Sequence, residues 1–107
     1  MSRLRYISIP LNADGEEEYN NGIEDTENIK TLNLSDEEFN FLYSKGVFDD
    51  INNQCELLID DYESEIIDNS KIQTCKEILS SFGDETETFK EAIRLAEANN
   101  TFIGLDF

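Results

Sequence analysis

The sequence predicts an α+β fold in which a small antiparallel sheet, formed by the terminal strands, packs against three to four helices. Three observations support this prediction. Apolar residues alternate at both ends of the chain, apolar residues recur at helical spacing in the middle, and the 107 residues with 38% hydrophobic content fit one domain spanning 1–107. An all-helical bundle with extended tails is the alternative.

The first strand is expected in residues 3–11 and the last in residues 101–107, each with one apolar side. Pro10 lacks an amide hydrogen, which places it at the end of its strand or on a sheet edge. A short second strand is expected at 28–33. The residues that share one side of the two terminal strands are Ile7, Ile9, Leu11, Ile103, Leu105 and Phe107.

Residues 12–28 are expected to form an acidic, exposed loop. The segment holds seven acids, no base, few apolar residues and the turn-forming run Asn-Asn-Gly at 20–22. Loops of this length in small domains are commonly functional or disordered.

The first central helix has a clear start. Ser35 is the predicted N-cap, Glu38 completes a capping box, and Leu34 and Phe39 are spaced for a hydrophobic staple. Gly46 is expected to end the helix in the left-handed conformation.

Three more helices are expected from apolar spacing. The first runs from Phe48 to Ile66, with Tyr62 on its buried stripe, although Asn52 and Asn53 could divide it. The next spans about Ser70 to Phe82. The last starts at a second capping box, Asp84 with Glu87, and ends near Asn99 and Asn100.

Charge is the most informative property for function. The chain has 25 Asp and Glu, 8 Lys and Arg and no His, which gives a formal net charge of −17. Such an excess opposes compaction but speeds association with basic surfaces, so a basic protein is the expected partner, and direct binding to nucleic acid or anionic membrane is disfavoured. The chain has no long apolar run or signal-peptide pattern, and a cytoplasmic location is expected.

The residue inventory argues against an enzyme, and we predict neither a catalytic site nor a cofactor. Histidine, Gly-rich phosphate loops and metal-binding cysteine sets are all missing. Asn12, Asp14 and Gly15 match an EF-hand loop in part, but Pro10 and Asn21 occupy its decisive positions, so no metal site is predicted.

Cys55 and Cys75 both fall on apolar helical stripes. They are interpreted as small buried side chains without chemistry. Their spacing alone leaves a disulfide open, although a cytoplasmic setting argues against one.

The predicted partner-binding site is an acidic ridge. No base occurs between Lys45 and Lys71, and on a continuous helix most acids there would project away from the apolar stripe. Leu57 would stand exposed within the ridge as an apolar anchor, as would Ile67 near its end, unless a bend near Asn53 turns Leu57 inward. The predicted contact residues are Asp49, Asp50, Glu56, Leu57, Asp60, Asp61, Glu63 and Asp68.

The layout resembles the immunity proteins of bacterial polymorphic toxin systems, including contact-dependent growth inhibition. Residues 34–65 carry the resemblance through Leu-Ser-Asp-Glu-Glu-Phe, Gly-Val-Phe-Asp-Asp-Ile-Asn and Ile-Asp-Asp-Tyr-Glu-Ser-Glu. The resemblance implies a tight complex with a cognate toxin domain, often a basic nuclease, whose active site the acids cover.

Two other classes stay open. One is a nucleic-acid mimic that inhibits a DNA-binding or defence protein, and the other is a non-catalytic acidic adaptor domain. The oligomeric state is left open as well.

Overall fold

A computed structural model describes residues 4–23 and 26–107 of the chain. Its centre is a four-stranded antiparallel sheet in the order β2-β1-β4-β3. The strands are β1 (Tyr6–Pro10), β2 (Ile29–Asn33), β3 (Ser64–Ile67) and β4 (Ile103–Asp106). The first and last strands pair as predicted, with Ile7 opposite Leu105.

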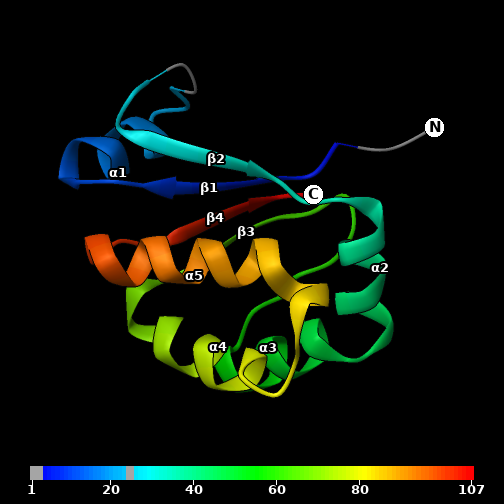
Figure 1. Cartoon of the computed structure of the whole chain (residues 1–107). Helices are drawn as coiled ribbons and strands as arrows, with labels where there is room; N and C mark the ends of the chain where they lie inside the picture. Colours follow the sequence, from blue (N-terminus) through cyan, green and yellow to red (C-terminus); the bar gives the residue numbers. More distant parts are fainter. Residues whose placement is uncertain (1–3, 24–25) are drawn as a thin grey trace.

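Five helices of the described chain lie on one face and at the two ends of the sheet (Figure 1). They are α1 (Ala13–Asn20), α2 (Asp36–Ser44), α3 (Val47–Cys55), α4 (Ile72–Leu79) and α5 (Glu87–Asn99). Helix α5 packs on β1, β2 and β4, while α4 packs on α5 and α3 packs on α4. Helices α1 and α2 lie at opposite ends of the sheet (Figure 1). The predicted α+β class is confirmed.

The core lies between the sheet and α2 to α5. Ile7 and Leu105 are fully buried on the helix-facing side of the sheet, as strand alternation predicts. The ring of Phe107, the last residue, meets Phe39 edge-on at a centroid distance of 5.4 Å and lies 5.7 Å from Phe48. This aromatic cluster joins the end of the sheet to α2 and α3.

The predicted helix over 48–66 is wrong beyond Cys55, where α3 ends. Glu56 adopts a left-handed conformation with φ of 57°, and the side chain of Asn52 both donates to the Ile59 carbonyl (3.0 Å) and accepts from the Ile59 amide (2.7 Å). These two bonds hold a turn that continuous helix cannot contain. Residues 56–63 then form an irregular connection, and 64–67 become strand β3.

This change reverses several burial predictions. Tyr62, expected in the core, is 76% exposed, and Leu58 is 79% exposed. Ile67, expected outside, is fully buried because β3 pairs with β4 and turns it toward the helices. Leu57, expected as an exposed anchor, is partly buried and packs against the core, as the alternative bend anticipated.

The expected loop at 12–28 contains helix α1. Asn12 caps this helix by accepting from the Gly15 amide at 2.8 Å. The negative charges of Asp14 and Glu16, in the first turn, interact favourably with the positive N-terminal end of the helix. A Cβ atom at Gly15 would lie 2.2 Å from the Asn28 carbonyl oxygen, so only glycine lets α1 pack this closely against the chain entering β2.

The helix caps differ from the prediction in two respects. Ser35 caps α2 as expected, and Gly46 is left-handed with φ of 77°. The Glu38 carboxylate, however, accepts from the Thr88 and Phe89 amides, at 3.2 and 2.9 Å, and so caps α5. The expected box of Asp84 with Glu87 is absent, because a 3₁₀ turn at Asp84–Thr86 precedes α5.

The Glu38→Ala variant should lower the free energy of unfolding by about 2 kcal/mol, because it leaves two amides at the buried start of α5 without an acceptor. Urea unfolding followed by circular dichroism measures this. Glu37→Ala, an exposed neighbour on α2, is the control and should change stability by no more than about 0.5 kcal/mol. Equal effects would contradict a capping role for Glu38.

Candidate protein-binding surface

The predicted contact residues do not form a single helical ridge. Asp49 and Asp50 lie in the first turn of α3, and Glu56 ends that helix. Asp68 follows β3. The others, Leu57, Asp60, Asp61 and Glu63, lie in the 56–63 connection. The ridge as predicted is therefore wrong, because three separate segments carry these side chains.

Part of the predicted set nevertheless comes together around Tyr43 of α2. The negative charge of Asp60 and its hydrogen bond with the Tyr43 hydroxyl raise the pKa of Tyr43, and the charges of Asp49 and Asp61 add to this effect. Tyr43 is 51% exposed, so the grouping lies at the surface. We call Asp36, Asp49, Asp60 and Asp61 the carboxylate patch.

Arg5 lies beneath this patch and holds two of its members. Its Nη1 donates to Asp36 at 2.7 Å, and its Nη2 lies 3.1 Å from Asp61. The guanidinium also stacks over the Phe39 ring, 3.8 Å from the centroid, and Arg5 is only 7% exposed. One cation thus meets two carboxylates, and the patch keeps a negative charge.

Sequence reasoning missed Asp36, Tyr43 and Arg5 as members of this surface. Arg5 lies 31 residues from Asp36 and 56 from Asp61 along the chain. No local pattern could have indicated these pairings, because they depend on how β1, α2 and the 56–63 connection meet.

Several carboxylates are held by neutral donors. Glu18 accepts from Asn28 at 2.7 Å and Thr26 at 3.1 Å, and these bonds lower its pKa. Asp68 accepts from the Ser70 hydroxyl at 2.7 Å, which likewise lowers its pKa. A neutral donor orients a carboxylate without cancelling its charge. The surface therefore presents fixed negative groups.

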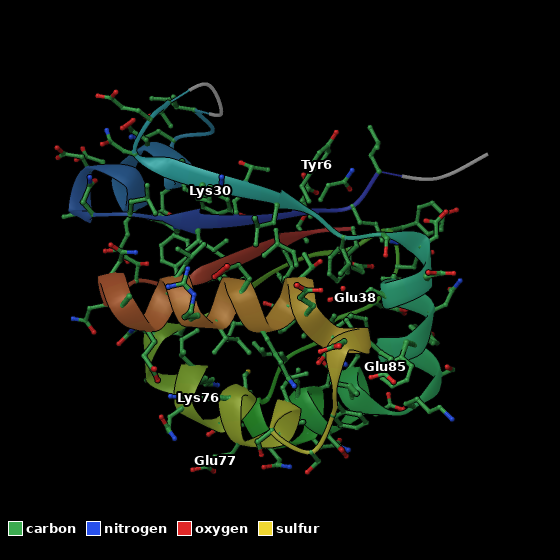
Figure 2. The ribbon with its side chains drawn as sticks, viewed as in Figure 1. Tyr6, Lys30, Glu38, Lys76, Glu77 and Glu85 are labelled. Carbon is green, nitrogen blue, oxygen red and sulfur yellow. The ribbon has the colours of Figure 1, made fainter. Side chains whose placement is uncertain are left out.

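Charge is also unevenly distributed along the described chain. Residues 4–23 and 26–70 contain sixteen acids and three bases, whereas 71–107 contain seven acids and four bases. Two of these four later bases pair with acids: Lys76 with Glu97 and Arg94 with Glu91. Figure 2 shows Lys76 and Glu77 on α4, on the side of the molecule away from the sheet. The α4–α5 face is thus the mixed-charge face.

The two cysteines lie side by side in the core. The buried thiols of Cys55, at the end of α3, and Cys75, on α4, are hydrogen-bonded and not disulfide-linked. Burial, together with the neighbouring Cys55, raises the pKa of Cys75 to about 12. Their interpretation as buried apolar side chains is confirmed.

Among residues 4–23 and 26–107, no helix is long and apolar enough to cross a membrane. Within the same ranges, no three or more acidic or cysteine side chains are grouped so as to hold a metal ion.

Comparison with protein-family models gives no match, and no curated protein matches the chain. Among solved structures, the chain is similar to the Neisseria DNA mimic protein DMP12, with a TM-score of 0.60 and 13% identity. The fold is shared. The alignment covers 97% of this chain and 98% of DMP12. None of these comparisons bears on a toxin-immunity system, so that expectation stays a prediction.

The Arg5→Met variant should lower the free energy of unfolding by about 2 kcal/mol, less than for a fully buried pair because Asp36 and Asp61 are partly exposed. Urea unfolding at neutral pH measures this. Lys45→Met, a change at an exposed base, should have an effect of no more than about 0.5 kcal/mol. An Arg5→Met variant as stable as the parent would contradict a structural role for the guanidinium.

Tyr43 should ionise at a higher pH than an unperturbed tyrosine, and Asp60→Asn should return its pKa toward the ordinary value. Because the folded-state pKa of Tyr43 is raised, the protonated hydroxyl contributes to the free energy of unfolding, and this contribution is complete below about pH 10. It is lost as the pH rises through the folded-state pKa. NMR titration of ring-labelled tyrosine measures it. Asp50→Asn is the control, and an equal effect of both variants would contradict the contact with Asp60.

Proposed function

We propose that the protein is a nucleic-acid mimic that binds a DNA-binding protein and occupies the surface where that protein holds phosphates. The observation that carries the proposal is the set of surface carboxylates held in place by neutral donors or by Arg5 on a chain of net charge −17. The shared fold with a DNA mimic protein supports it.

The physical reason is that DNA-binding proteins contact the DNA backbone largely through Lys and Arg, without regard to sequence. A carboxylate offers those bases a negative oxygen group in place of a phosphate. If the carboxylate is already oriented, less side-chain entropy is lost on binding. An excess of negative charge also speeds the encounter with a basic partner.

The carboxylate patch is the proposed centre of contact. Asp49 is exposed on α3, and Asp60 is exposed and oriented by the Tyr43 hydroxyl and by the Asp61 amide at 2.8 Å. Arg5 holds Asp36 and Asp61 in place from below. Three of the four carboxylates are therefore held in place, and the fourth, Asp49, lies close enough on α3 for its charge to raise the pKa of Tyr43.

A mimic and an immunity protein differ in their partners. A mimic competes with generic duplex DNA and binds more than one DNA-binding protein, whereas an immunity protein binds one cognate toxin. The experiment therefore starts with the immobilised full chain in a bacterial extract. Bound proteins are eluted with a 20-base-pair duplex, and the eluted proteins are purified individually for affinity measurements.

The Asp49→Asn/Asp60→Asn double variant should weaken binding to such a purified protein about tenfold and flatten its dependence on salt, because two charge contacts are lost. Isothermal titration at several salt concentrations measures both effects. Duplex DNA should displace the parent chain from each partner.

The matched control is the Glu77→Gln/Glu97→Gln double variant, which removes the same charge from the α4–α5 face. It should bind within about twofold of the parent, since only long-range steering changes. Equal losses in both double variants would show that net charge alone acts. A single partner that duplex DNA does not displace would contradict mimicry and favour a dedicated inhibitor.

A further inference from the structure

The face of the sheet opposite α5 contains a cleft. Antiparallel pairing places Asn33, Tyr6, Asp106 and Ser64 in one row across the four strands on this face, and Thr31, Ser8, Gly104 and Ile66 in the next. Figure 2 shows Tyr6 projecting from the sheet on the side away from α5. A cleft of about 550 Å³ opens above these rows, lined partly by Tyr6, Ser8, Tyr19, Thr31, Ser64 and Asp106.

One wall of the cleft depends on Gly104. A Cβ atom at this position would lie 2.3 Å from the Tyr19 hydroxyl oxygen and 2.4 Å from Cζ, so the ring lies directly on the backbone of β4. Phe102 supports the Tyr19 ring edge-on at 5.4 Å. The phenol of α1 is thus held in a fixed position over the sheet.

Asp106 is the charged group of the cleft. It lies between Tyr6 and Ser64 in its row, and the Ser64 hydroxyl donates to its Oδ1 at 3.1 Å. No base within residues 4–23 and 26–107 forms an ion pair with it, and none lines the cleft. Burial and the charge of Asp106 raise the pKa of Tyr19, so the negative charge of Asp106 reaches the Tyr19 hydroxyl on the wall of the cleft.

We propose that this cleft binds an arginine side chain from an extended segment of the partner. The proposal rests on the proposed function for the identity of that partner. A planar guanidinium can donate two parallel hydrogen bonds to a carboxylate and stack on an aromatic ring, and Asp106 lies beside Tyr6 for this purpose. The hydroxyls of Ser8, Tyr19 and Thr31 offer acceptors for the remaining donors.

The size and charge of the cleft fit this ligand. Its volume lies within the range of about 300 to 1,000 Å³ typical of ligand sites, which accommodates one long side chain with its flanking backbone. Among the described residues that line it, the single ionised group is an acid, Asp106, which repels phosphate and carboxylate ligands. A basic side chain is the complementary ligand.

The test uses the full chain and two short probes, acetyl-Gly-Arg-Gly-amide and the matched peptide with neutral citrulline in place of arginine. Amide shifts in two-dimensional NMR report binding. We expect the arginine peptide to shift Ser8, Ser64 and Gly104 in a saturable manner in the millimolar range, and the citrulline peptide to bind at least fivefold more weakly.

Asp106→Asn should weaken the binding of the arginine peptide at least fivefold, while the asparagine side chain keeps an acceptor for the Ser64 hydroxyl. Glu77→Gln is the charge-matched control, because Glu77 is an exposed acid of α4 that lies outside the cleft. It should bind as the parent does. The amide spectra of both variants show whether the fold is intact.

Equal binding of the two peptides, unchanged binding to Asp106→Asn, or shifts confined to the carboxylate patch would each overturn the proposal. Tighter binding of acetyl-Gly-Lys-Gly-amide would overturn the choice of arginine. If a purified partner that DNA displaces binds Asp106→Asn as tightly as the parent, the proposed role of the cleft is overturned, whereas the proposal of mimicry is unaffected. If no such partner exists, the peptide titration still decides the cleft by itself.

Discussion

The guanidinium of Arg5 is the contact on which the carboxylate patch depends. It is the one buried cation among the described residues, and it joins the start of β1 to α2 through Asp36 and to the 56–63 connection through Asp61. Its stacking on Phe39 ties this ion network to the aromatic cluster. Two of four neighbouring carboxylates are thereby fixed, which limits their mutual repulsion without making the patch neutral.

The net charge of −17 opposes folding, and packing and hydrogen bonds offset this repulsion more than ion pairs do. The sheet is covered on one side by α5, and Phe107 closes the core at the end of the chain. Glu38 is used as a helix cap in the interior, where its charge meets the positive end of α5. Most other acids of the described chain lie at the surface, where some are held by neutral groups and four pair with bases: Asp36, Asp61, Glu91 and Glu97.

Sequence patterns predicted the elements whose signals are local. The terminal strands follow from alternation, and the start of α2 follows from Ser35. The helix predicted after Cys55 was wrong because the apolar residues of that segment recur at helical spacing without forming a helix. In the structure, the side chain of Asn52 bonds to the backbone of Ile59, and β3 pairs with a strand about forty residues away. The local spacing of apolar residues predicts neither of these contacts.

The candidate surface was predictable in composition and not in arrangement. The shortage of bases between Lys45 and Lys71 did indicate where negative charge would gather. Which acids meet depends on contacts distant in sequence: Asp36 and Asp61 meet through Arg5. The cleft beside Asp106 had no sequence signal, since Gly104 and Tyr19 are brought together only by the packing of α1 on β4.

The small number of bases is itself a condition for the proposed activity. A carboxylate paired with lysine must lose that partner before it can bind a new one, and the exchange yields little net free energy. A carboxylate held by serine, threonine, asparagine or tyrosine keeps its full charge and its orientation together, as Glu18, Asp60 and Asp68 do. Added lysines would stabilise the isolated chain and compete with its partner for the same acids. The chain instead carries 25 acids against 8 bases, so neutralisation by a basic surface would be part of the driving force for the proposed binding.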